Sequence, residues 1–178
     1  MKAPVNNSSQ GTAEQYLVTP GSLGSICIGV FDIGNWKTVF AGEEKIKHKL
    51  LIRFEVDEKI EGGEYDGKNK CLNKWYNFSM HPKSTLRKDI QSWRGRELTD
   101  EEAEDFDLCD LVGQQCLLSV VNKDGNGRTF QNITSISTVP KGMSKVKADV
   151  LYKDGDIPEF IEKIKEKSYK PENDTDPF

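Results

Sequence analysis

The stretch from Asp110 to Val139 reads DLVGQQCLLSVVNKDGNGRTFQNITSISTV and carries the clearest secondary-structure signal in the chain. Two runs rich in apolar and β-branched residues flank Asp124–Gly127, whose DGNG sequence favours a tight β-turn. Strand, turn and strand in this order predict a β-hairpin. DGNG also has the composition of a calcium-binding loop, but the sequence lacks the later glutamate and the ligand spacing of an EF-hand, so the turn is the better interpretation.

Three further strands are predicted upstream of this hairpin. Residues 24–36 form an extended apolar run with β-branched and aromatic side chains, residues 45–56 alternate strictly, and residues 74–80 form a short third strand. The alternation of 45–56 defines two faces. One face consists of Ile46, His48, Leu50, Ile52, Phe54 and Val56, and the other of Lys45, Lys47, Lys49, Leu51, Arg53 and Glu55. In the third strand, one face consists of Tyr76, Phe78 and Met80.

Helices are predicted between the third strand and the hairpin, and again near the C-terminus. Ser84 is a suitable N-cap for a helix whose apolar residues recur at helical spacing over 86–93, and Gly95 ends it. Thr99 opens a second, short helix with a capping-box pattern. Residues 157–169 predict a last amphipathic helix.

The predicted order is therefore strand, strand, strand, helix, strand, strand. We expect a mainly β protein built as a five-stranded, partly open barrel of the OB-fold type, with a helical insert between strands 3 and 4 and a short C-terminal helix. A generic antiparallel sheet with a packed helix is the alternative. The expected divisions are a flexible N-terminal arm (1–20), the barrel domain (21–140), a linker with a short helix (141–170) and an acidic C-terminal tip (171–178).

Composition and motifs argue against several classes of protein. The chain has 178 residues, of which 30% are charged, and no apolar run approaches the roughly 18 residues of a membrane span. Because a secretory leader is also absent, we expect a cytoplasmic protein. Four irregularly spaced cysteines and two histidines predict neither a disulfide framework nor a metal site, and no cofactor is expected. No nucleophile motif, Walker loop or His-rich motif is present, so we expect no enzymatic activity.

Negative charge is concentrated in two segments. Residues 97–110 contain eight acids and no lysine or arginine, and the tip adds Glu172, Asp174 and Asp176. The net charge of the chain is −4, so removing these eleven negative charges leaves +7. The rest of the chain is thus a basic body suited to an anionic partner.

The basic residues of the body follow a pattern. Alternate positions of a strand lie about 7 Å apart, which is close to the phosphate repeat of an extended single strand. Proteins bind single strands with a basic groove and aromatic platforms on which bases stack. The candidate nucleic-acid-binding residues are Lys45, Lys47, Lys49, Arg53, Trp36, Lys74, Trp75, Arg87 and Arg94. Surface lysines on a half-buried strand, and tryptophans packed in the core, are the alternatives that stay open.

The chain closes on KPENDTDPF, residues 170–178. A terminal phenylalanine can fill an apolar pocket of a partner while its α-carboxylate pairs with a basic residue there, and neighbouring acids steer the encounter. This acidic Pro-Phe ending resembles the C-terminal tip of bacterial and phage single-stranded-DNA-binding proteins. The matching residues are Asp174, Asp176, Pro177 and Phe178.

Two body segments resemble small phage members of the same family. Residues 84–108 are similar to their helical insert, and residues 110–137 to their closing segment, in which a Leu-x-Gly turn leads into the last hairpin. The resemblance covers about residues 16–140. Unlike bacterial members, the chain has only three acids in its tip, Asp176 in place of an apolar residue before Pro-Phe, and no long Gly/Gln-rich linker.

The resemblance implies an OB-fold protein that coats single-stranded DNA without sequence preference in phage replication or recombination. It also implies recruitment of replication and recombination proteins through the tip, and residence in the host cytoplasm. The main alternative is a protein–protein adaptor with an OB-like barrel that binds no nucleic acid. A nuclease or other enzyme is disfavoured by the missing catalytic residues, and a homo-oligomer is compatible with each reading.

The tip yields a first prediction. Phe178→Ala keeps every side-chain charge, so affinity for single-stranded DNA should be unchanged while recruitment of partner proteins is lost. A pull-down of phage or host replication proteins beside a DNA titration checks both halves. Retention of the partners by the variant would show that the terminal phenylalanine is incidental.

Overall fold

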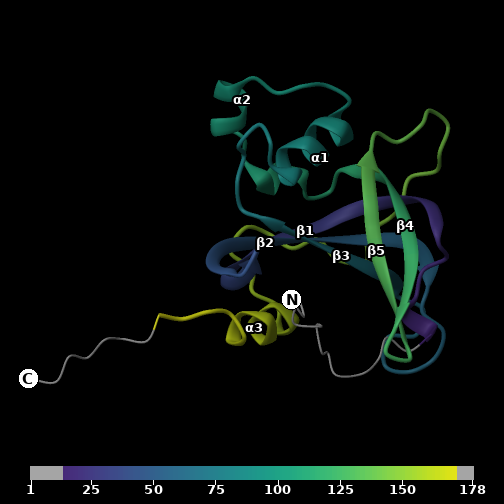
Figure 1. Ribbon diagram of the computed structural model, residues 1–178. Helices are drawn as coiled ribbons and strands as arrows, with labels where there is room; N and C mark the ends of the chain where they lie inside the picture. The colour runs from purple at the N-terminus through teal and green to yellow at the C-terminus, as the bar shows by residue number, and fades with distance from the viewer. Residues whose placement is uncertain (1–13, 172–178) are drawn as a thin grey trace, which may run out of the picture.

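A computed structural model describes residues 14–171 of the chain. Five strands form one antiparallel sheet with the order β3-β2-β1-β4-β5. The strands are β1 (Gly21–Phe40), β2 (Glu43–Lys59), β3 (Asn69–Asn77), β4 (Gln115–Gly125) and β5 (Arg128–Ser137). In Figure 1, β1, β2 and β3 cross the middle of the molecule and the β4–β5 hairpin stands upright at one side. The mainly β class and the five strands are confirmed.

The helices lie on two sides of the sheet. The elements are the 3₁₀ helices η1 (Glu14–Tyr16) and η2 (Leu108–Leu111), and the α-helices α1 (Thr85–Arg94), α2 (Asp100–Glu104) and α3 (Glu159–Glu166). The helical insert of α1, α2 and η2 lies above the β1–β3 strands in Figure 1, and α3 lies below them. Local signals set the helix ends, because the Ser84 hydroxyl accepts a hydrogen bond from the Arg87 amide and Gly95 adopts a left-handed conformation.

The sheet is not closed into a barrel. Within residues 14–171, the backbone ladders end at β3 on one side and at β5 on the other. Helix α1 packs against both of these edge strands. Its apolar side chains join a core that includes Leu72 and Tyr76 of β3 and Ile133 of β5. Side-chain packing by the helix, rather than strand pairing, therefore covers the opening between the two edges.

The β1–β2 hairpin is longer than the sequence pattern predicts. Ala41 and Gly42 both have positive φ angles, of 51° and 79°, and form a two-residue turn that lets pairing run to Phe40 opposite Glu43. Pairing of β3 with β2 stops at Asn77 opposite Lys49. Residues 36–48, which we call the hairpin arm, therefore extend past the end of β3.

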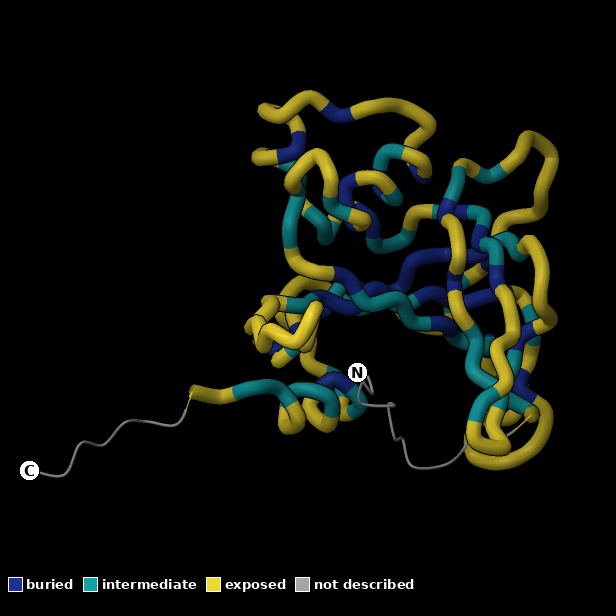
Figure 2. Tube along the Cα trace, viewed as in Figure 1, coloured by how far each residue is buried: buried dark blue, intermediate teal, exposed yellow. Residues whose placement is uncertain are grey.

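The alternation predicted for β2 is confirmed, but its apolar face is buried only from Leu50 onward, because Ile46 and His48 are exposed in the hairpin arm. Leu50, Ile52, Phe54 and Val56 lie in the main core, which also contains the apolar side of α1. Figure 2 shows the buried segments concentrated along these central strands. Leu51, on the opposite face, is equally buried but belongs to a second cluster. Both faces of the central sheet are therefore covered.

The cover on the second face is the segment expected as a linker with a short helix, residues 141–170. Ile161 of α3 is 1% exposed and packs against Leu51. Backbone amides of Tyr152 and Tyr169 donate hydrogen bonds to Ile28 and Asn35 of β1, at 2.8 and 2.7 Å. The segment thus follows the edge of β1 that β4 leaves unpaired.

Side-chain hydrogen bonds attach the segment around Asp149 and the first described residues to the sheet. The buried carboxylate of Glu55 accepts hydrogen bonds from Asn69 Nδ2 at 2.9 Å and from the Asp149 amide at 2.7 Å. Val18, in the predicted N-terminal arm, is buried, and Gln131 bonds both its amide and its carbonyl. Residues 14–20 are therefore fixed to β5.

The packing of α3 gives a stability prediction. Ile161→Ala should lower the free energy of unfolding by about 2–5 kcal/mol, the usual cost of emptying a buried aliphatic site. Ile157→Ala is the matched control, because Ile157 is 53% exposed and its truncation should change stability by less than about 0.5 kcal/mol. Urea titration measures both. Equal effects of the two variants would contradict the docking of α3 on the sheet.

Candidate nucleic-acid interface

Three lysines of β2 line one face of the hairpin arm and its base. Lys45 and Lys47 are exposed and Lys49 is half-buried, and we call these three residues the lysine row. Partial burial, followed by repulsion from the Lys47 ammonium, lowers the pKa of Lys49. A bound anion would relieve this repulsion. The row is therefore a place where phosphate binding is electrostatically favourable.

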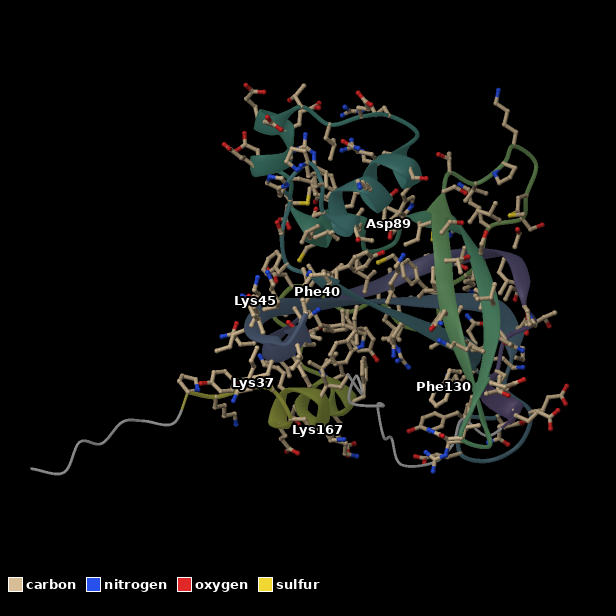
Figure 3. The ribbon with its side chains drawn as sticks, viewed as in Figure 1. Lys37, Phe40, Lys45, Asp89, Phe130 and Lys167 are labelled. Carbon is tan, nitrogen blue, oxygen red and sulfur yellow. The ribbon has the colours of Figure 1, made fainter. Side chains whose placement is uncertain are left out.

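Acidic neighbours neutralise the arm only in part. Lys45 lies 3.7 Å from Glu43, and Lys37 lies 3.3 Å from Glu44. Both pairs are exposed, and such pairs contribute at most about 1 kcal/mol, so a phosphate can replace the carboxylate. Figure 3 shows Lys37, Phe40 and Lys45 at the same end of the molecule, far from Phe130 of β5.

Three other predicted residues lie on the same face of the sheet as the lysine row, in the part of that face that α3 covers. Trp36 is 7% exposed, pairs with Lys47 across the hairpin and packs edge-to-face on Trp75 with ring centroids 5.0 Å apart. The Arg53 guanidinium lies 4.3 Å from the ring centroid of Phe160 and donates to Asn73. The core alternative therefore describes Trp36, while Trp75 and Arg53 are half-buried.

The last three predicted residues lie on the side of the helical insert. Lys74 pairs with Asp89 of α1 at 2.6 Å, and Arg87 is buried, donating to the Asp100 carboxylate and to the Leu98 carbonyl. Arg94 is exposed, with its guanidinium 5.4 Å from the ring centroid of Phe106. Lys74 and Arg87 thus stabilise the insert, and the structure does not bring these three residues together with the lysine row.

The sequence pattern did not reveal an aromatic pair at the base of the arm. Phe78 follows the last residue of β3, is 47% exposed and packs edge-to-face on His48 with ring centroids 5.2 Å apart. The alternation of 74–80 placed Phe78 with the buried Tyr76, and only the early end of β3 leaves it in solvent.

The ring of His48 is held in place by Asp32. Its Nε2 lies 2.7 Å from Asp32 Oδ1. Burial would raise the pKa of Asp32, but the hydrogen bonds with His48 and with the Gly34 amide outweigh it and the pKa is lowered. His48 therefore has a fixed orientation beside Phe78.

Residues 14–171 were compared with the requirements of a metal site, a membrane-spanning helix and a reactive cysteine. Within that range no group of three or more His, Cys, Asp or Glu side chains could hold a metal ion, and no helix is long and apolar enough to cross a membrane. All four cysteines are free, and burial raises the pKa of Cys27 to about 12. The predicted partner-binding residues Asp174, Asp176, Pro177 and Phe178 lie outside the described residues, and their role stays a prediction.

Comparisons with protein-family models, with curated proteins and with solved structures found no match for this chain. Any functional conclusion therefore depends on the geometry of the hairpin arm and its surroundings.

The Asp32–His48 pair gives a pH prediction. A lowered folded-state pKa of Asp32 contributes stability that is present above the unfolded-state value near pH 4 and is lost as the pH falls through the folded-state value. His48→Ala removes the main hydrogen bond that lowers the pKa, so the pKa of Asp32 should rise. NMR titration of the Asp32 carboxyl carbon measures it. His81→Ala is the control and should leave the Asp32 pKa unchanged, and an unchanged pKa in His48→Ala would contradict the assignment.

Proposed function

We propose that this protein binds single-stranded DNA without sequence preference and coats it during phage replication or recombination. The observation that carries the proposal is the lysine row, a line of cations on an arm that extends past the covered part of the sheet. Phosphate contacts of this kind carry no sequence information. Coating of any exposed strand is the activity that such an arm supports.

The strand connections support an OB-type arrangement as part of this proposal. In the sheet, β1 pairs with both β2 and β4, and the helical insert joins β3 to β4. The insert helix α1 reaches both edge strands and lies across the opening between them. A five-stranded, partly open barrel has this order of elements. Proteins of that architecture often bind oligonucleotides. By analogy, the arrangement supports the hairpin arm as the surface that binds nucleic acid.

Charge segregation supports a nucleic-acid partner. The acids of residues 97–110 lie in the helical insert, whereas the lysine row lies on the arm. Attraction to a polyanion therefore acts at one part of the molecule rather than over its whole surface. The acidic tip extends the proposal, because a terminal phenylalanine that follows two nearby acids, Asp174 and Asp176, suits recruitment of replication and recombination proteins.

Exposed apolar residues at the arm favour the second candidate, a protein adaptor. Val39, Phe40 and Ile46 are all exposed, and Phe40 reaches 76%. Side chains of this kind bind protein partners as readily as they stack on bases. The adaptor would use the same arm without any phosphate.

A DNA titration tests the proposal. Wild-type protein should bind a labelled 35-residue oligo-dT, with affinity falling as salt rises by a slope of about 0.7 for each phosphate contact. Replacing all of the lysine row by glutamate should weaken binding at least tenfold and make the salt slope shallower by about 2, since three contacts are lost. Fluorescence anisotropy at several salt concentrations measures both values.

The matched control is Lys141→Glu, Lys145→Glu and Lys153→Glu in one variant. These three lysines are exposed and lie outside the arm, and the change in net charge is identical. Equal losses in the two triple variants would mean that net charge, rather than the arm, governs binding. Absence of wild-type binding at low salt would overturn the proposal in favour of the adaptor.

A further inference from the structure

A hollow of about 490 Å³ lies between the base of the hairpin arm and the start of α1. Its wall includes Ile46, Lys47, His48, Phe78, His81 and Lys83. We propose that this hollow is a subsite for one unpaired nucleobase of the bound strand, with Phe78 as its stacking surface. The inference rests on the proposed function and names a contact that the lysine row alone does not provide.

The wall of the hollow combines an exposed aromatic ring with a fixed neighbour. The Phe78 amide donates a hydrogen bond to the His48 carbonyl at 2.9 Å, which extends the β2–β3 pairing by one residue and holds Phe78 opposite His48. The two rings meet at 88°. Because Asp32 fixes the imidazole, Phe78 has a preferred orientation before any ligand binds. A rigid, half-exposed aromatic ring is the kind of surface on which bases stack.

Cations border the aromatic pair. Lys47 belongs to the lysine row and also lines the hollow, although His48 and Phe78 lie on the opposite face of β2 from the row. Because β3 ends at Asn77, the edge of β2 beyond it has no pairing strand, and a nucleic-acid strand on the row can pass round this edge to Phe78. Lys83 lines the hollow as well, and its amide donates to His81 Nδ1 at 3.2 Å. Lys47 and Lys83 can therefore bind the phosphates on the two sides of a base that occupies the hollow.

This subsite would select single strands over duplexes. In a duplex the faces of each base are covered by its neighbours, and turning a base out costs a few kcal/mol. The lysine row attracts both forms through their phosphates, whereas the aromatic face is useful only to an unpaired base. The hollow therefore provides the preference for single strands over duplexes, which the lysine row does not provide.

Truncation of Phe78 tests the inference. Phe78→Ala should weaken binding of the 35-residue oligo-dT by about tenfold and leave the salt slope unchanged, because stacking releases no counterions. Phe78→Trp should restore wild-type affinity. Tyr65→Ala is the matched control, since Tyr65 is 53% exposed but lies in the loop between β2 and β3, and it should bind as wild type does. Lys83→Ala should make the slope shallower by about 0.7.

Photocrosslinking locates the base directly. Oligo-dT containing 5-iodouracil, irradiated with the full-length protein and digested, should give a crosslinked peptide that contains Phe78. If wild-type protein binds but Phe78→Ala matches Tyr65→Ala and no crosslink reaches Phe78, the subsite is overturned while single-strand binding stands. If wild-type protein does not bind the oligonucleotide at all, both proposals fall. Circular dichroism melting confirms that each variant is folded.

Discussion

Burial of both faces of β2 is the constraint on which the architecture depends. Leu50 and Leu51 are neighbours that point to opposite sides of the sheet, and both are almost fully buried. Each face therefore requires its own cover. Helix α1 provides one cover, and α3 with the segment before it provides the other. Undocking either helix would expose a continuous apolar surface of the sheet to water.

The candidate interface lies where this double cover ends. The alternation of β2 continues from its buried half into the arm. On one side β3 stops at Asn77, and on the other Trp36 is the residue of β1 nearest the turn in the apolar cluster that contains Ile161 of α3. Positions that hold leucine and phenylalanine under the helices hold lysine, isoleucine and histidine in the arm. One strand thus serves as core at one end and as a ligand-facing surface at the other.

Polar contacts make the second cover specific. The buried Glu55 carboxylate has two donors, Asn69 and the Asp149 amide, so residues 147–149 are fixed at one position on the sheet. A buried carboxylate without such donors would carry a large desolvation cost. The same logic applies to Arg87, whose buried guanidinium is satisfied by Asp100 and Leu98. Residues that look available for phosphate in the sequence are thus already used within the fold.

Local chemistry in the sequence determined the element order, the helix caps at Ser84 and Thr99, and the two faces of β2. Each of these depends on residues a few positions apart, so a pattern in the chain is sufficient to predict it. The tertiary structure alone decided that α3 covers Trp36, that Arg87 is buried and that Phe78 is exposed. Solvent exposure depends on which distant segments pack together. Identical side chains therefore become core or surface according to contacts that no local pattern contains.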